Sequence, residues 1–349
     1  MRGAERTFAE IAACWPEAPI YTLLYDRDAV ADQLGSHPVQ ASYLQRLGVR
    51  QRGFRYLLPL FPRAAEHLSV EGYDVVVSSS SAFAHGSHPR PGALHVCYCH
   101  SPFRYAWFER DRALAETPRL ARPLMRRTLN RIRKWDLAAA RRVTHFVANS
   151  EITRERIAQF YGVESEVVHP PVAVERFSIG VPEDYLLFVG QLVRHKRADI
   201  AIEAAMLAGR PIKVVGEGPE RAVLEARYAG CPAQFLGSVT DEHLAELYAN
   251  CLALVVPNVE EFGIAAVEAQ AAGRPVVGLR SGGVRETVVD GETGLLVDGE
   301  GAASLAEPLN DVDFGRFDSE AIRSHAQRFS AASFRDRFRK VVDGYRDLA

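Results

Sequence analysis

The second half of the chain alternates short apolar runs with longer stretches of helical composition. The apolar runs predict strands at 186–189, 212–215, 234–236, 252–256, 276–279 and 295–297. The intervening stretches predict helices at 198–208, 219–228, 241–249, 263–272 and 283–289. Alternation of this kind over about 110 residues predicts a doubly wound α/β domain whose parallel sheet binds ligands at the carboxyl ends of its strands.

The first half repeats this alternation less regularly. Strands are predicted at 20–24, 75–78, 94–97 and 145–148, and helices at 4–14, 122–141, 152–161 and part of 101–108. A proline-rich joint beginning at His169-Pro170-Pro171 separates the halves. We therefore expect α/β domains at 1–170 and 184–330, a linker at 171–183, and final helices at 319–329 and 334–348.

Composition is that of a soluble globular enzyme. The sequence contains no apolar run long enough to span a bilayer, and its first residues do not form a signal peptide. The five cysteines are scattered, which favours a reduced, cytoplasmic setting. Cys97, Cys99 and His100 have no second pair of ligands at a metal-binding spacing, so we predict alternating strand residues there and no metal site.

Charge is distributed unevenly although the net charge is only −2. Residues 1–175 carry a net +5 and residues 176–349 a net −7. The basic excess is concentrated at 119–142, where arginines and a lysine alternate with Leu124, Leu129 and Ile132. A basic, partly amphipathic helix of this kind can lie on an anionic membrane, or it can be a solvated helix that packs through its apolar stripe. Nucleic acid is not favoured because no recognition motif accompanies the charge.

The segment 260–277 has the strongest functional pattern. Glu260 and Glu268 are eight positions apart across Phe262-Gly263, which opens a helix that follows a strand. Free backbone N–H groups and the positive end of the helix dipole suit a phosphate at that point. Glu268 lies two turns inside the helix and can reach a hydroxyl-rich part of the same ligand. The alternative is an amphipathic helix with two solvated glutamates.

Three other loops at predicted strand ends carry residues suited to a phosphorylated ligand. After the first strand of the second half, Arg194, Lys196 and Arg197 can neutralise a diphosphate leaving group without a metal. The Gly216–Glu220 turn and the Ser281–Gly283 turn, with Glu286 beyond it, let the backbone approach a ligand closely. The basic loop is also compatible with a solvated surface loop, and the 216–220 turn is by itself a weak signal.

In the first half, His100 lies at a predicted strand end, where a catalytic or sugar-binding histidine belongs in this architecture. Its neighbours Ser101, Arg104 and Tyr105 are also of the type that binds polar ligands. A structural histidine is the alternative.

Together these motifs resemble the family-4 retaining glycosyltransferases of the GT-B fold, over nearly the whole chain. The shared motifs are E-x7-E around F-G at 260–268, the loop with Lys196, G-E-G-P at 216–219, S-G-G-V-R-E at 281–286 and D-G-E-T-G-L-L-V at 290–297. The first half is similar to a mannosyltransferase-like branch of the family, in R-G-A-E-R, A-P-I-Y-T-L-L-Y-D, C-H-S-P-F-R-Y-A-W and V-A-N-S-E.

The resemblance implies two Rossmann-like domains that face each other across a cleft, with the acceptor bound by the first and the donor by the second. It implies catalytic roles for His100, Lys196 and Glu260, with Glu260 on the transferred sugar and Glu268 on the ribose hydroxyls. The other donor-binding residues it implies are Gly190, Arg194, Arg197, Gly216, Glu217, Gly218, Phe262, Gly263 and Ile264. On the acceptor side it implies Gly3, Glu5, Ser101 and Arg104.

The chain departs from the family pattern at two places. Gln191 stands where the family has an arginine, and Arg194 is expected to replace that charge. The resemblance begins at Arg2-Gly3-Ala4-Glu5, so the first strand of the first domain and a loop glycine are expected to be missing.

The resemblance implies transfer of a hexose, with retention, to a polysaccharide or lipid-linked glycan, as in lipopolysaccharide synthesis. GDP-mannose is the expected donor, and neither a metal nor another cofactor is expected. The expected location is cytoplasmic, with peripheral contact at the inner face of the plasma membrane through 119–142. Two alternatives stay open: a nucleotide-sugar epimerase or hydrolase on the same fold, and a non-catalytic or truncated homologue that binds nucleotide-sugar.

Overall fold

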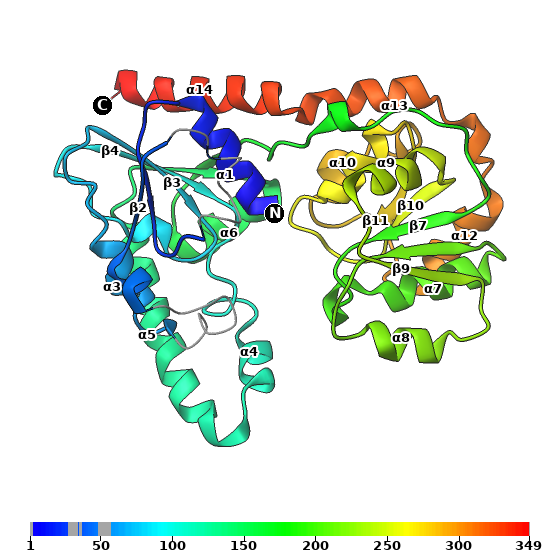
Figure 1. Ribbon diagram of the computed structural model, residues 1–349, viewed down its shortest axis with the longest axis horizontal. Helices are drawn as coiled ribbons and strands as arrows, with labels where there is room; N and C mark the ends of the chain where they lie inside the picture. Colours follow the sequence, from blue (N-terminus) through cyan, green and yellow to red (C-terminus); the bar gives the residue numbers. More distant parts are fainter. Residues whose placement is uncertain (1–2, 27–33, 35–36, 48–56, 349) are drawn as a thin grey trace. The chain divides into compact units, whose positions relative to one another are not determined.

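The computed structural model describes residues 3–26, 34, 37–47 and 57–348. The chain forms two compact units (Figure 1). The first comprises residues 1–169 with 334–349, and the second comprises residues 170–333. Each unit is built around a parallel sheet flanked by helices, which confirms the predicted α/β class with two Rossmann-like domains.

The second unit contains a sheet of six parallel strands in the order β12-β11-β10-β7-β8-β9. The strands are β7 (Leu186–Val189), β8 (Ile212–Val215), β9 (Ala233–Gly237), β10 (Ala253–Val256), β11 (Val276–Leu279) and β12 (Gly294–Val297). The chain builds outward from β7 to β9, then returns to β10 on the other side of β7 and builds outward again. The reversal between β7 and β10 is the switch point at which doubly wound sheets bind ligands.

Helices cover both faces of this sheet (Figure 1). They are α7 (Ala198–Leu207), α8 (Arg221–Arg227), α9 (Asp241–Asn250), α10 (Ile264–Ala271), α11 (Val284–Thr287), α12 (Ala302–Asp311) and α13 (Ser319–Ala326). One core contains Ile202 of α7 and Leu305 of α12. The other contains Tyr248 of α9 and Val267 of α10. Because both faces are buried, the central strands are almost wholly apolar, which made them easy to predict.

The first unit has a four-stranded parallel sheet in the order β3-β4-β5-β6 and a separate parallel pair, β1-β2. Its strands are β1 (Ile20–Thr22), β2 (Val39–Ala41), β3 (Val75–Ser80), β4 (Leu94–Cys99), β5 (His145–Ala148) and β6 (Ser165–Val167). Its helices are α1 (Gly3–Cys14), α3 (Phe61–Glu66), α4 (Arg110–Glu116), α5 (Arg122–Ala140) and α6 (Glu151–Tyr161). Helix α1 is the first element of the described residues.

The helix predicted within 101–108 is wrong. This segment makes successive turns, such as Ala106 N–H to the Phe103 carbonyl and Glu109 N–H to the Arg104 carbonyl, and helix α4 begins only at Arg110. Phe103 and Ala106 are buried because they pack into the core of the first unit with Phe83, while their backbone forms turns.

Helix α14 (Ala331–Leu348) supplies aromatic side chains to the core of the first unit. Phe334 and Phe338 pack edge-on against Tyr98 of β4, with ring centroids 5.7 and 5.6 Å away. Arg339 donates to the Cys14 carbonyl at the end of α1, at 2.8 Å. The last helix therefore belongs to the same core as the first one.

The opposite face of β3 and β4 carries a buried polar network. The Asp136 carboxylate of α5 accepts hydrogen bonds from Trp107 Nε1 at 2.7 Å and from the Tyr161 hydroxyl at 2.9 Å, and lies 3.2 Å from His85 Nε2. His85 Nδ1 is 3.0 Å from Ser80 Oγ. The network ties α5, α6 and the segment after β4 to the end of β3.

We predict that Phe338→Ala destabilises the first unit by about 3–5 kcal/mol, because it leaves a cavity beside Tyr98. Trp15, Trp107 and Trp135 are the only tryptophans and all belong to this unit, so urea unfolding followed by tryptophan fluorescence reports on it alone. Asp336→Ala, on the exposed side of α14, is the control and should change stability by less than about 0.5 kcal/mol. Equal stability of the two variants would contradict a core role for α14.

Candidate functional site at the carboxyl edge of the second sheet

The loops that follow β7 and β8 are joined backbone to backbone. Gly190 N–H donates to the Val215 carbonyl at 3.0 Å, and Leu192 N–H donates to the Glu217 carbonyl at 2.9 Å. Gly216 has φ +137°, and a Cβ there would overlap the Gly190 carbonyl. Only glycine permits both the conformation and the close approach.

The loop after β10 is held in a similar way by the loop after β11. Gly283 N–H donates to the Glu260 carbonyl at 2.8 Å. A Cβ on Gly282 would overlap that same carbonyl, and a Cβ on Gly283 would overlap the Phe262 backbone. Gly263, with φ +89°, turns the chain into helix α10. The predicted turn at 281–283 thus positions the loop that carries Glu260.

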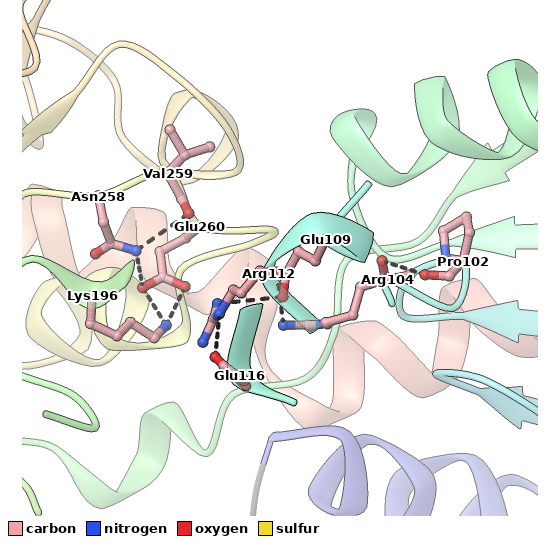
Figure 2. Close-up of polar contacts among 10 residues, drawn as sticks. Pro102, Arg104, Glu109, Arg112, Glu116, Lys196, Asn258, Val259 and Glu260 are labelled. Atoms are coloured by element: carbon pink, nitrogen blue, oxygen red, sulfur yellow. Dashed lines mark hydrogen bonds and ion pairs between the residues drawn. The ribbon is translucent and has the colours of Figure 1, made fainter. Parts of the chain in front are cut away.

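Lys196 and Glu260 form an ion pair across the switch point of the sheet (Figure 2). Lys196 Nζ lies 2.6 and 2.7 Å from the two carboxylate oxygens of Glu260. Asn258 Nδ2 donates to Glu260 Oε1 at 3.0 Å. The Lys196 and Glu260 side chains are 25% and 21% exposed, so solvent and a ligand can both reach them. The pair joins the loop after β7 to the loop after β10.

The remaining cations of the β7 loop differ in their surroundings. Arg194 is exposed, and Arg197 is held by Asp199, with Nε to Oδ1 at 3.1 Å. Arg197 has φ +52° and precedes the first residue of α7. Gln191 is exposed beside Gly190.

Glu268 is nearly buried, with 8% of its surface exposed, and lies in α10 behind this loop. Its Oε2 accepts a hydrogen bond from the Tyr248 hydroxyl at 3.0 Å. Burial, together with the charge of Glu268, holds the pKa of Tyr248 well above its ordinary value. Tyr248 therefore stays protonated as a donor and fixes the orientation of the carboxylate.

The other predicted donor-side residues frame the same edge. Glu217 is exposed and pairs with Arg221, while a Cβ on Gly218 would overlap the Leu192 carbonyl. Phe262 is buried against Phe329, and Ile264 is the first residue of α10. The N–H groups at the start of such a helix have no partner within it and face the end of the loop.

In the first unit, His100 follows β4 directly, and its ring is oriented by β3. Ser79 Oγ is 2.8 Å from His100 Nε2, and the Tyr98 ring meets the imidazole edge-on at 5.2 Å. Burial lowers the pKa of His100 to about 4. The imidazole is therefore neutral near pH 7, with Nε2 committed to Ser79.

The predicted acceptor-side residues lie in two segments. Ser101 is buried and donates to the Pro102 carbonyl at 3.1 Å, and Arg104 Nη1 is 3.7 Å from Glu109 Oε1 (Figure 2). Gly3 and Glu5 lie in the first turns of α1. The structure thus gives Ser101 and Arg104 a place directly after His100, whereas Gly3 and Glu5 belong to a helix rather than to a loop.

Three residues that contact predicted site residues were not themselves predicted: Ser79 in the first unit, and Tyr248 and Asn258 in the second. Ser79 and Tyr248 each contact a predicted residue from a different element, whereas Asn258 contacts Glu260 within the same loop. Ser79 lies in a run of four serines, which signals a polar strand end, but no pattern in the sequence identifies which serine meets His100.

Comparison with known proteins decides the family. The family model described as Glycosyltransferase Family 4 matches residues 1–176, and the model described as Glycosyl transferases group 1 matches residues 173–320. The chain belongs to glycosyltransferase family 4. Family 4 was the family predicted from the motifs, and the α/β architecture agrees with it.

Curated relatives of this family-4 chain include D-inositol 3-phosphate glycosyltransferases. The protein of that name from Streptomyces bingchenggensis is 33% identical over 246 residues, which cover 58% of this chain and 54% of the relative. That from Geodermatophilus obscurus is 37% identical over 221 residues, covering 53% and 49%. The chain thus spans about half the length of these curated relatives. They are inositol-phosphate glycosyltransferases, so the mannosyltransferase-like branch stays a prediction.

Solved structures agree on the fold. HepE from Anabaena, in complex with UDP, superimposes with a TM-score of 0.71 at 17% identity, covering 98% of this chain and 96% of that one. Sucrose-phosphate synthase from Thermosynechococcus elongatus gives 0.69 at 19% identity, covering 89% and 84%.

We predict that the first unit loses stability as the pH falls from about 6.5 toward 4. Burial lowers the pKa of His95 to about 3 and that of His100 to about 4, whereas both titrate near 6.5 when unfolded. The unfolded chain then binds more protons than the folded one, so acid favours unfolding. Urea unfolding followed by tryptophan fluorescence at several pH values measures the slope.

His95→Gln should reduce that slope while keeping a polar group beside Ser78, whose Oγ is 2.9 Å from His95 Nε2. His67→Gln, on the surface after α3, is the control and should leave the slope as in the parent. If stability falls with pH equally steeply in the parent and both variants, His95 is not a source of the acid sensitivity.

Proposed function

We propose that this protein is a retaining hexosyltransferase that transfers a sugar from a nucleotide-sugar donor to a glycan. The second unit binds the donor, and the first unit binds the acceptor. The observation that carries the proposal is the Lys196–Glu260 ion pair at the switch point, beside the glycine-lined loops and the start of α10. A cation next to free helix N–H groups suits a diphosphate, and a carboxylate beside it suits sugar hydroxyls.

In this proposal each charged group of the pair has a separate task. Lys196, with Arg194 and Arg197 near it in sequence, neutralises the diphosphate as the bond to the sugar breaks. Glu260, held by Asn258, receives hydroxyls of the transferred sugar. Glu268, oriented by Tyr248, receives the ribose hydroxyls. The leaving phosphate takes the acceptor proton, so that no protein nucleophile and no metal is required.

His100 is proposed to contact the sugar from the first unit. The neutral imidazole uses Nε2 for Ser79, which leaves Nδ1 for a sugar hydroxyl. Ser101 and Arg104 follow it in the chain and are proposed to contact the acceptor. Gly3 and Glu5 of α1 are also proposed as acceptor-side residues.

For the donor we propose GDP-mannose, on the resemblance of the first-half motifs to mannosyltransferase-like members of the family. UDP-glucose is the second candidate because HepE has been solved in complex with it. The acceptor is proposed to be a polysaccharide or lipid-linked glycan, assembled by a cytoplasmic enzyme that touches the inner face of the plasma membrane.

Thermal unfolding with GDP-mannose, GDP, UDP-glucose and UDP tests the donor. A ligand at about 100 times its dissociation constant stabilises the native state by roughly 2.7 kcal/mol. We expect the largest rise in unfolding temperature with GDP-mannose. A larger rise with UDP-glucose would make UDP-glucose the donor instead. No rise with any nucleotide would refute the transferase proposal.

Glu268→Gln keeps the size of the side chain and its contact with Tyr248 but removes the charge. We expect donor affinity to fall about tenfold or more, because a charged acceptor is lost to the ribose hydroxyls. Glu242→Gln, exposed on α9, is the matched control. Unchanged affinity for the donor in Glu268→Gln would rule out the ribose assignment.

Ser79→Ala tests the orientation of His100. Losing the hydrogen bond to Nε2 should lower kcat about tenfold, the effect of one such bond of roughly 1.4 kcal/mol, while the KM for the donor changes little. Ser79→Thr should restore most of the rate because it keeps the hydroxyl, and exposed Ser81→Ala is the control. A fall in stability without a fall in kcat would give Ser79 a structural role only.

A further inference from the structure

Helices α4 and α5 form a hairpin whose tip lies away from the β3–β6 sheet of the same unit (Figure 1). The tip is the 3-10 turn Arg119–Ala121 with the first turn of α5. Leu120 is 98% exposed and Leu124 is 70% exposed. Among the described residues Leu120 is the most exposed large hydrophobic side chain, followed by Val181 at 81% and then by Leu124.

The base of the hairpin is anchored firmly. Asp136 of α5 is fully buried and holds Trp107 and Tyr161. The Arg133 guanidinium stacks over the Trp107 ring at 4.4 Å, and Arg110 Nη2 donates to Asn130 Oδ1 at 2.6 Å. A rigid base means that the tip presents its leucines and arginines in a fixed arrangement.

The outward side of the hairpin is strongly basic. Between residues 119 and 142 there are nine arginine and lysine residues, and the only acidic residue, Asp136, is buried and faces inward. Leu124, Arg127, Arg131 and Lys134 follow one another at intervals of three and four residues, so they share one exposed stripe of α5.

Most of these cations have no acidic neighbour. Among the described residues, the structure records no ion pair for Arg126, Arg127, Arg131 or Lys134. A row of exposed cations repels itself unless an anionic surface balances it, and two exposed leucines at its end lose their contact with water when they enter an apolar phase.

We propose that the hairpin tip is a membrane anchor: Leu120 and Leu124 enter the headgroup region of an anionic bilayer, and the stripe of Arg127, Arg131 and Lys134 lies along its phosphates. A soluble polyanion would satisfy the arginines but not the leucines, and a nucleic acid would favour exposed aromatic rings between the cations, which the described part of this stripe does not contain. The anchor deepens the peripheral location proposed above and does not depend on which sugar is transferred.

Co-sedimentation of the full chain with vesicles tests the anchor. We expect binding to vesicles of phosphatidylcholine with phosphatidylglycerol, little binding to phosphatidylcholine alone, and release as salt is raised, because screening shortens the range of the attraction. Equal binding to both kinds of vesicle, or binding to neither, would overturn the proposal.

Two pairs of variants separate charge from insertion. Arg127→Gln with Arg131→Gln should weaken binding about 25-fold, at about fivefold for each cation, whereas Lys340→Gln with Arg346→Gln on exposed positions of α14 should change it far less. Leu120→Ser should weaken binding roughly tenfold, whereas Leu207→Ser, which is also exposed, should not.

If the arginine variant loses vesicle binding and Leu120→Ser binds as well as the parent, insertion of Leu120 into the bilayer is overturned. If the parent binds heparin up to the same salt concentration as it binds vesicles, and Leu120→Ser changes neither binding, the partner is a soluble polyanion and not a membrane. If the parent sediments in the absence of vesicles and Leu120→Ser does not, the tip is a self-association surface and not a membrane anchor. Nucleotide-induced thermal shifts should be the same in every hairpin variant, so a missing donor shift with intact vesicle binding would refute the transferase proposal alone.

Discussion

Close approach of one backbone to another is the constraint on which the candidate site depends. At Gly216, Gly282 and Gly283 there is no room for a β-carbon, because each residue lies directly against the backbone of a neighbouring loop. These contacts hold the loops after β7, β8, β10 and β11 at one edge of the sheet, so that side chains more than sixty residues apart in sequence can meet. Substitution at these glycines would move whole loops rather than single side chains.

The charged groups of the site use that fixed backbone in different ways. Lys196 and Glu260 are partly exposed and attract each other across the switch point, so the diphosphate proposed to bind Lys196 would compete with a carboxylate already in place. Glu268 is almost buried, and its one identified hydroxyl partner, Tyr248, comes from another helix. The Lys196–Glu260 pair is suited to exchanging its partners for a ligand, whereas the Tyr248–Glu268 hydrogen bond is suited to holding the carboxylate in one orientation.

Much of this architecture was predictable because it follows from local composition. The central strands β7, β10 and β11 are buried on both faces and therefore apolar, and glycines follow several strand ends. The short strands β2 and β6 escaped prediction because pairing with a neighbour, rather than their own sequence, makes them strands. The segment 101–108 misled because Phe103 and Ala106 pack into the core, although their backbone forms turns and not a helix. Contacts such as Ser79 with His100 join separate elements, which one sequence does not reveal.

The passage of α14 into the first unit has a consequence for synthesis. The second unit is one continuous stretch of chain, residues 170–333, whereas the first needs Phe334 and Phe338, which are made only after the whole second unit. The second unit can therefore complete its core on the ribosome while the first still exposes Tyr98 and its neighbours. During that interval the nascent chain avoids aggregation only if chaperones cover the exposed core or if synthesis of the remaining residues is fast. Premature termination near residue 330 would release a chain whose second unit is folded and whose first unit has an exposed core.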